Sequence, residues 1–474
     1  MLKEKKMENE VFRLDISNDV RVFDSKEYSG NNEIIEVFVP DSVIEIGEGV
    51  FRDCAKIKKV ILSKNLKIIN KNAFRRCKDL RKIEIPEGVE RIEDYAFFGC
   101  EKLSRVVIPS SVKFIGKFAF HSCQNLYSIG IHTEADIVGL IDSIDTNNII
   151  ELIVSGNIIE ENQFAKFNHL ERLILSNGVT TVKKNAFGEQ PKLKEFHIPK
   201  TIKVYDSAMH NSTSGSHYHY LDCYFHGTVY EWINFQPSHN IVDYFALKEL
   251  YMLEDDMWVN PTKVIIPDGV TEIREYQFAN LKHLKTVILP DSITSIGLYA
   301  FHYCESLQHI DLPKNLVFID RLAFSSSGLV SIKVPNSLNE LGFQAFCGCG
   351  ALNEVKLPDS LQKIGDSAFN QCGFANIKLP KNLKIIEARA FDTCWRLEKI
   401  IIPEGVTKLG NRAFRKCHKL KSITLPNSLT DIGEKLFEYC KNHDGKSRKI
   451  YAPRKIVPLI KVEEYKDVEI VIID

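Results

Sequence analysis

The sequence lacks the features that would place it in a membrane, in the secretory pathway or on nucleic acid. No apolar run approaches the roughly 18–20 residues that a membrane-spanning helix needs. The first residues, Met1 to Glu10, read MLKEKKMENE, and no apolar segment follows them, so we expect no standard secretory signal. Lys and Arg total 62, as do Asp and Glu, and this balance favours neither nucleic acid nor an anionic membrane as a partner.

Familiar catalytic motifs are also missing. The chain contains no GxGxxG at a strand–helix turn, no GxxxxGKS/T phosphate loop, no GxSxG and no HExxH. Acidic pairs such as Asp255-Asp256 are typical of solvated turns. We therefore predict that the protein is not an enzyme and uses no cofactor, although one sequence does not reveal groups that meet only in the folded chain.

What the sequence does contain is a repeat of about 23 residues. We index each copy from an anchor residue, which is proline in eleven of twelve clear copies. An aliphatic residue follows the anchor by three positions, Ile or Leu by six, and Phe by eleven. The anchors are Pro40, Ser63, Pro86, Pro109, Pro267, Pro290, Pro313, Pro335, Pro358, Pro380, Pro403 and Pro426. The phenylalanines are Phe51, Phe74, Phe97, Phe120, Phe278, Phe301, Phe324, Phe346, Phe369, Phe391, Phe414 and Phe437.

Each copy predicts one short coil of chain. The residues before the anchor, such as 422–425, alternate apolar and polar, which favours a strand. Proline ends this strand because it cannot donate to a ladder. A second extended piece, a turn and a helical or 3-10 Ala-Phe segment complete the copy. One coil cannot bury its own apolar side, but stacked coils can, so we predict a mostly β repeat solenoid.

Residues 357–372 read LPDSLQKIGDSAFNQC. This motif resembles the unit of the BspA-type leucine-rich-repeat family, LPxSLxxIGxxAFxxCxxLxxIxLP. The resemblance implies a right-handed coil with parallel strands and short helical or 3-10 turns, in a single elongated domain. It also implies a non-enzymatic scaffold that binds a protein or glycan, with adhesin-like interaction at host or cell surfaces in similar proteins. An intracellular interaction scaffold is the alternative.

The repeat divides the chain into regular and irregular segments. Clear copies cover 34–132 and 263–440, and degenerate copies cover 151–209. Residues 133–150 lack the Ala-Phe signature and predict an irregular insertion. Residues 210–262 are rich in aromatic residues and histidine, and Gly227–Trp232 resembles the GTxxEW element of the family, so we predict a variant coil that ends in a hairpin. Residues 1–33 and 441–474 are predicted to cap the two ends.

Ten of the twelve cysteines occupy one position of the repeat, fourteen residues after the anchor. Such a position favours a small buried side chain, and a free thiol suits it. Stacked equivalents would have parallel Cβ vectors, which is poor disulfide geometry. Reduced thiols and the missing signal favour a cytoplasmic protein, and the resemblance implies a secreted or surface protein as the alternative. These cysteines are Cys54, Cys77, Cys100, Cys123, Cys304, Cys349, Cys372, Cys394, Cys417 and Cys440.

His217, His219, Cys223 and His226 place four metal-type side chains within ten residues. Their spacing matches no standard zinc module, so ordinary surface histidines are the competing interpretation. An enzyme or metal protein built on residues 210–262 is therefore the alternative function from another class.

The surface most suited to binding is the face lined by the first strand of each coil. Its outward side chains lie four and two positions before each anchor, because side chains alternate along a strand. Lysines on adjacent coils predict a basic stripe, and apolar side chains there are typical of interaction faces. The competing interpretation is that β-branched residues merely favour strands and that lysines provide solubility. We expect a protein or glycan partner, no nucleic acid and no membrane insertion. The candidate partner-binding residues are Phe38, Ile61, Ile288, His309, Asp311, Lys333, Lys356, Lys378, Lys399 and Ile401.

Overall fold

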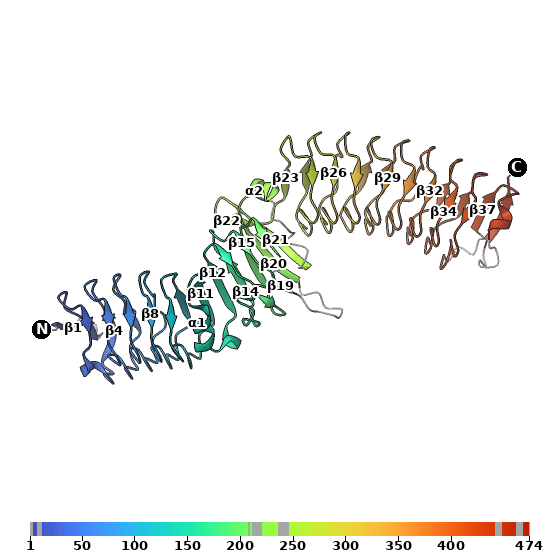
Figure 1. The fold of residues 1–474 in the computed structure, drawn as a ribbon. Helices are drawn as coiled ribbons and strands as arrows, with labels where there is room; N and C mark the ends of the chain where they lie inside the picture. Colours follow the sequence, from blue (N-terminus) through green and yellow to red (C-terminus); the bar gives the residue numbers. More distant parts are fainter. Residues whose placement is uncertain are drawn as a thin grey trace. The chain divides into compact units, whose positions relative to one another are not determined.

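The computed structural model describes residues 3–6, 12–206, 209–210, 220–235, 246–440, 448–460 and 468–473. They form two compact units. The first unit comprises residues 1–227 and 235–246, and the second comprises 228–234 and 247–474. In each unit, short strands of successive coils lie side by side (Figure 1). The predicted parallel β repeat solenoid is confirmed.

Each regular coil contributes two short strands to two separate parallel sheets. The first strand precedes the anchor, and the second lies five or six residues after it, as in β4 (Ile34–Phe38) and β5 (Glu45–Ile46). The strand β4 pairs in parallel with β6 (Lys59–Ile61), the equivalent strand of the next coil. This pairing brings Phe38 beside Ile61, so residues one repeat apart become neighbours. The strands are short because the anchor ends each first strand.

The first unit contains strands β1 to β20. Its first-strand sheets comprise β1 (Lys3–Lys6), β2 (Phe12–Asp15), β4, β6, β9 (Arg105–Ile108), β11 (Ser128–His132), β12 (Glu151–Ser155), β14 (Arg172–Leu175), β17 (Glu195–Pro199) and β20 (Tyr220–His226). Its second strands are β3 (Val22–Phe23), β5, β7 (Ile68–Ile69), β8 (Arg91–Ile92), β10 (Phe114–Ile115), β13 (Ile158–Ile159), β15 (Thr181–Val182) and β18 (Val204–Tyr205), with β16 (Gly188–Glu189) and β19 (Met209–His210) as a further pair.

The second unit repeats this arrangement. Its first strands are β23 (Lys263–Ile265), β25 (Thr286–Ile288), β28 (Ser331–Lys333), β30 (Glu354–Lys356), β33 (Lys399–Ile401), β35 (Ser422–Thr424), β37 (Arg448–Ala452) and β38 (Val468–Ile472). Its second strands are β24 (Glu272–Ile273), β26 (Ser295–Ile296), β27 (Phe318–Ile319), β29 (Glu340–Leu341), β31 (Lys363–Ile364), β32 (Ile385–Ile386), β34 (Lys408–Leu409) and β36 (Asp431–Ile432).

A column of stacked phenylalanine rings forms the centre of each unit. In the first unit, the ring centroids of Phe51, Phe74, Phe97 and Phe120 are separated in turn by 5.3, 5.3 and 5.2 Å. All four side chains are almost completely buried. A second column runs from Phe278 to Phe437 with similar spacings. The repeat spacing therefore places every Phe on its counterpart, where the rings gain both apolar burial and offset stacking.

The Ala-Phe segment of the regular coils is a pair of tight turns rather than a helix. Non-glycine residues there have positive φ, for example Asp53 at 59°, Arg76 at 59° and Tyr95 at 57°. This conformation lets alternate amides donate to the next coil: the amide of Phe74 donates to the carbonyl of Ala96 at 2.8 Å. The hydrogen bonds between coils compensate for a backbone conformation that L-residues seldom adopt.

The thiol of the repeated cysteine donates a hydrogen bond that the sequence did not reveal. The Cys77 thiol donates to the carbonyl of Phe51, 26 residues earlier, with 3.2 Å between donor and acceptor. All ten cysteines at this position make the equivalent bond. Burial raises the pKa of most of these thiols, as for Cys54, whose pKa is about 11. The thiol is therefore both a small apolar filler and a donor to the preceding coil.

The irregular segments depart from the regular coil, and the sheet of second strands that ends at β10 does not continue into β13. Residues 133–150 contain α1 (Ile137–Ser143) and the 3-10 helix η2 (Thr146–Asn148), and Leu140 is completely buried. In the segment with the predicted hairpin, β21 (Ala246–Glu254) pairs antiparallel with β22 (Met257–Val259). The helix α2 (Val229–Asn234) holds Trp232, whose indole N–H donates to the carbonyl of Gln277 at 2.6 Å. The ends also contain the 3-10 helices η1 (Lys26–Tyr28) and η3 (Val457–Leu459).

The N-terminal segment adds coil structure to the first repeat. The strand β2 pairs in parallel with β4, and β3 pairs in parallel with β5. Residues 12–28 therefore extend both sheets rather than only covering the first coil. Among the described residues, no helix has the length and apolar character needed to cross a bilayer.

Candidate functional site

The first strands present two rows of outward side chains along each unit. We call the residues four positions before each anchor the first outward row, and those two positions before it the second outward row. The residue between them points into the core: in β6, Lys59 and Ile61 are exposed and Val60 is buried. The predicted alternation of the strand-lined face therefore matches the structure.

In the second unit, the second outward row combines apolar and basic residues. Ile265 lies beside Ile288, and they are 53% and 47% exposed. Further along this unit, Lys333 lies beside Lys356, and both are exposed. Such exposure of isoleucine in register on a sheet leaves apolar area for a partner to bury.

The four predicted lysines divide between the two rows. Asn376 bridges to Lys399, so Lys399 lies in the first outward row, whereas Lys378 shares its row with Ile401. Lys378 and Ile401 are exposed, the latter by 55%. The basic stripe therefore consists of Lys333, Lys356 and Lys378, with Lys399 beside it.

Charge on this stripe is partly balanced. The Lys356 ammonium lies 2.8 Å from the carboxylate of Glu354, and this contact lowers the pKa of Glu354. His309 Nδ1 lies 3.0 Å from the hydroxyl of Ser331. His309 and Asp311 are exposed in a coil whose residues before Pro313 form no strand. They flank the stripe on its N-terminal side.

The first unit has a basic row that the sequence analysis did not single out. Lys59, Lys82 and Arg105 face one another in register in the first outward row. All three are exposed, with Ile61 at 43% and Val107 at 45% exposure beside them. Phe38 is half-buried, since the Arg13 guanidinium lies 5.3 Å from its ring centroid. The signal for the row was present in the sequence as basic residues at intervals of 23.

Further along the first unit, the outward rows become polar and aromatic. The Arg172 guanidinium lies 3.2 Å from Glu151 and 2.6 Å from Glu195, which raises its pKa. His197 stacks on Tyr224 with 4.5 Å between ring centroids. Burial lowers the pKa of His197 to about 4, so its imidazole is neutral at neutral pH.

The structure separates the predicted metal candidates. His217 and His219 lie outside the described residues. Cys223 points into the core, whereas His226 lies on the other face of β20, with its Nε2 3.2 Å from His197 Nδ1. Side chains on opposite faces of a strand cannot share one ion. In the part of the chain that the structure describes, no three His, Cys, Asp or Glu side chains are grouped to hold a metal.

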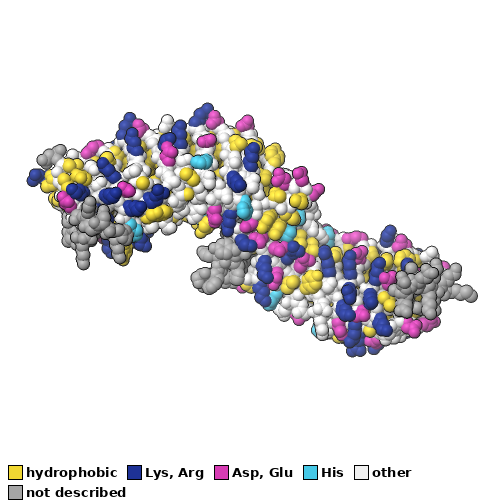
Figure 2. Space-filling model, turned by 180° about the vertical axis from the view of Figure 1, so that it is seen from behind, with side chains coloured by type: hydrophobic (Ala, Val, Ile, Leu, Met, Phe, Trp, Pro, Cys, Tyr) yellow, Lys and Arg dark blue, Asp and Glu magenta, His cyan; other side chains and the backbone are white. Residues whose placement is uncertain are grey.

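The surface seen in Figure 2 carries both signs of charge. Figure 2 shows Lys and Arg side chains interspersed with Asp and Glu and with apolar groups on the face it presents. Ion pairs between neighbouring coils contribute to this mixture, such as Lys183 with Glu160 at 2.6 Å and Lys421 with Glu398 at 2.9 Å. The basic residues of the outward rows are therefore local features of a neutral protein.

Comparisons with known proteins support the repeat assignment. A family model described as "BspA type Leucine rich repeat region (6 copies)" matches residues 8–127, 142–216, 257–349 and 317–444, well over half of the chain. The comparison with curated proteins found no match.

Several solved structures are similar to this chain. A leucine-rich repeat protein from Bacteroides ovatus ATCC 8483 is 20% identical, with a TM-score of 0.25, over 100% of this chain and 98% of that chain. A leucine rich cell surface protein from Faecalibacterium prausnitzii A2-165 is 18% identical, with a TM-score of 0.24, over 92% and 93% of the two chains. A chain of the Drosophila Toll–Spatzle complex is 13% identical, with a TM-score of 0.29, over 89% and 56%.

Proposed function

The chain belongs to the BspA-type leucine-rich repeat family, and we propose that it is a non-enzymatic scaffold that binds a protein partner on its strand-lined face. The observation that carries the proposal is the second outward row, in which the exposed Ile265 stands beside Ile288 and Lys333 beside Lys356. The exposed Asp311 occupies this row in the coil between the two pairs. The partner surface that fits this row is apolar with acidic groups beside it.

The apolar part of the row supplies binding energy. Ile265, Ile288 and Ile401 are each about half exposed. Completing the burial of one such side chain contributes roughly 1 kcal/mol, since full burial of isoleucine is worth about 1.5–3 kcal/mol. Three of them correspond to about a hundredfold in affinity before the costs of association are subtracted.

The basic part of the row supplies orientation and rate. Lys333, Lys356 and Lys378 carry their charges at the surface, where ion pairs contribute little affinity but accelerate encounter with an acidic partner. An interaction of this kind weakens as salt rises, because exposed charges are screened. An apolar contact without charge would not respond in this way.

Charge reversal tests the proposal. The variant K333E/K356E/K378E reverses the stripe, and the matched control K314E/K381E/K384E reverses three exposed lysines of the same unit that follow their anchors, outside both outward rows. Tagged full-length protein and both variants are used for affinity capture from an extract, and captured partners are then titrated in isolation.

We expect the first variant to lose partners that the wild type and the control retain, and the affinity to fall with added salt. An unchanged set of partners would refute the proposal. Loss of capture after enzymatic deglycosylation of the extract would assign recognition to a glycan instead of a protein surface.

A further inference from the structure

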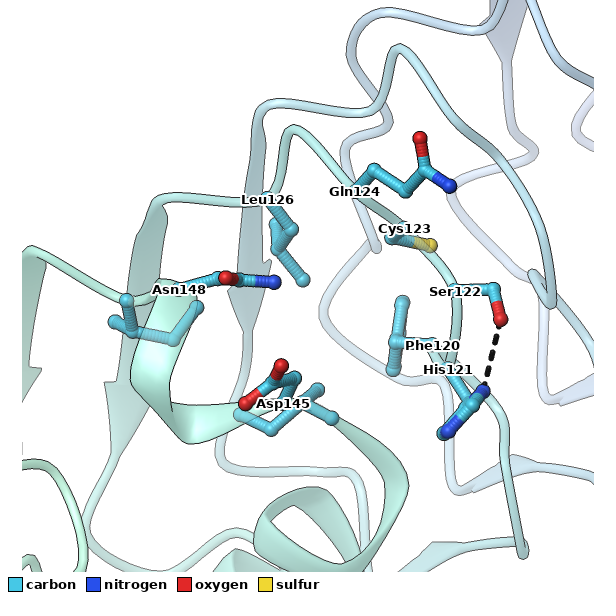
Figure 3. Close-up of a pocket in the computed structure, with 10 residues that line it drawn as sticks. Phe120, His121, Ser122, Cys123, Gln124, Leu126, Asp145 and Asn148 are labelled. Atoms are coloured by element: carbon cyan, nitrogen blue, oxygen red, sulfur yellow. Dashed lines mark hydrogen bonds between the residues drawn. The ribbon is translucent and has the colours of Figure 1, made fainter.

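A pocket lies on the turn-bearing side of the first unit, away from the strand-lined face. Its volume is about 230 Å³, and it is bounded by the turn 120–126 and by residues 144–149 of the insertion. Figure 3 shows Asp145 and Asn148 of the insertion across the pocket from Phe120, His121 and Ser122. Asp145 and Asn148 are exposed, so the pocket opens to solvent.

This pocket occupies the place where a regular coil would continue the stack. In the preceding coils, the amide of each Phe donates to the next coil, as Phe97 does to the carbonyl of Ala119 at 2.8 Å. The amide two residues later does the same, as Gly99 does to the carbonyl of His121 at 2.9 Å. The insertion replaces the following Ala-Phe turn with α1 and η2, so this ladder of hydrogen bonds stops at residues 120–122.

At the end of this ladder, two backbone N–H groups are available to donate a hydrogen bond to a ligand. Within the described residues, the amides of Phe120 and Ser122 donate to no backbone or side-chain acceptor. Both residues line the pocket. They are two positions apart, as are the carbonyls of Ala119 and His121 that serve the preceding coil. An extended peptide presents successive carbonyls on one side with the same spacing of two residues.

The opposite wall of the pocket carries an acceptor. One carboxylate oxygen of Asp145 accepts the amide of Asn147 at 3.1 Å, which orients the side chain at the start of η2. Its charge favours a basic group in the pocket and opposes an anion. A ligand that offers carbonyl oxygens to one wall and a cationic donor to the other therefore fits the pocket on both sides.

A second pocket of about 420 Å³ adjoins the first and shares Ser122 and Gln124 with it. It lies over the turns of earlier coils and is lined by charges of both signs, including Asp53, Arg76 and Glu101. The first pocket is smaller than sites for drug-sized molecules, which suits a short stretch of a longer chain. The ligand would continue from the first pocket into the second.

We propose that this pocket binds an extended peptide segment with a basic side chain, whose carbonyls accept from the amides of Phe120 and Ser122 and whose cation pairs with Asp145. The segment takes the position that the next Ala-Phe turn would occupy in a regular coil. This is strand addition at an open ladder, with the basic side chain setting specificity. The site is separate from the strand-lined face and does not depend on the function proposed there.

The test uses the full chain and a displayed library of random short peptides as the probe. Asn148→Phe fills the pocket from an exposed position, and Asp145→Asn removes the charge while keeping an oxygen for the Asn147 amide. The control is Asp142→Asn, an exposed carboxylate on α1 that does not line the pocket. Thermal unfolding of each variant confirms that the fold is retained.

We expect selected peptides to be rich in Lys or Arg and to protect the amides of Phe120 and Ser122 from hydrogen exchange. Asn148→Phe should weaken peptide binding by at least about tenfold, because its ring displaces one peptide group from the pocket and a loss of ~1.4 kcal/mol in binding free energy is tenfold in affinity. Asp145→Asn should weaken it roughly two- to fivefold, as loss of one exposed ion pair does, and Asp142→Asn should have no effect.

Failure to select any peptide, or binding that survives Asn148→Phe, would overturn the proposal. Binding of neutral oligosaccharides on an array, lost in Asn148→Phe, would overturn the peptide assignment in favour of a sugar. The strand-face variant K333E/K356E/K378E should bind the selected peptides normally, so failure of this site and failure of the strand-face site are distinguished.

Discussion

Truncation of a ring in the phenylalanine column should destabilise its own coil and both neighbours. Phe97 is completely buried, with Phe74 at 5.3 Å on one side and Phe120 at 5.2 Å on the other. Replacement of a buried Phe by Ala costs about 3–5 kcal/mol, because apolar burial is lost and a cavity remains. We expect Phe97→Ala to lie in the upper part of this range, since two ring contacts disappear with it.

Phe120 provides the matched comparison. It is 1% exposed and stacks on Phe97, but its other side borders the pocket beside the insertion. Phe120→Ala therefore removes one stacked pair rather than two and should cost about 0.5–1.5 kcal/mol less than Phe97→Ala. The two variants remove the same atoms from equivalent positions of the repeat, so their difference reports the contribution of the second neighbouring ring, which the pocket replaces at Phe120.

Hydrogen exchange with mass spectrometry is the suitable assay. Stability in a stacked array is a sum of coil and neighbour contributions, so a single unfolding free energy is not defined. Phe97→Ala should accelerate exchange in the turns that contain Phe74, Phe97 and Phe120, and Phe120→Ala only in the last two. Equal destabilisation by both variants, or changes confined to distant coils, would refute the reasoning.

Three further predictions concern titration and capping. Burial raises the pKa of Cys54 to about 11 and of Cys349 to about 12, from an ordinary value near 9. The unfolded thiols ionise first, so the midpoint of urea unfolding, followed by hydrogen exchange in the coils of Cys54 and Cys349, should fall as pH rises from about 9 to about 11. A midpoint that does not change with pH would contradict this. Burial lowers the pKa of His197 from 6.5 to about 4, so protonation favours the unfolded form. Exchange protection of β17 should therefore fall as pH drops from 6.5 towards 4. In His197→Phe this pH dependence should become weaker, and the remainder should come from His226, whose pKa is also lowered by burial. The Asp136 carboxylate accepts hydrogen bonds from the amides of Gly139 at 2.9 Å and Ile115 at 2.8 Å. Asp136→Ala should therefore destabilise α1 by about 1–2 kcal/mol, measured as faster hydrogen exchange of residues 137–143. The control variant Asp136→Asn should lie closer to wild type.

Much of the candidate binding face could be predicted from the sequence. Alternation along each first strand placed Ile288, Ile401, Lys333, Lys356 and Lys378 at the surface, where the structure shows them exposed. The order of residues before each anchor also separates Lys399 from the other three lysines. The alternative of a metal site could not be judged from spacing alone, because Cys223 and His226 lie on opposite faces of β20 and His217 and His219 lie outside the described residues.

The turns of the coils were beyond the reach of the sequence. Side chains as different as Asp53, Arg76 and Tyr95 adopt positive φ there, so residue type carries no signal. Where glycine does occur after the second strand, it avoids contact with the preceding coil: a Cβ on Gly410 would lie 2.3 Å from the amide nitrogen of Ala388. Backbone conformation in these turns follows from the hydrogen bonds between coils.

By itself, the sequence determined the period, the parallel coils, the buried phenylalanine column and the outward rows. Identical side chains at a constant interval must occupy equivalent environments, and only stacking provides them. The tertiary structure alone decided the thiol bond from Cys77 to Phe51, the charged cluster around Arg172, and the open amides of Phe120 and Ser122. These features depend on which groups a neighbouring coil presents, and that is set by the stacking of residues more than twenty positions apart rather than by any local motif.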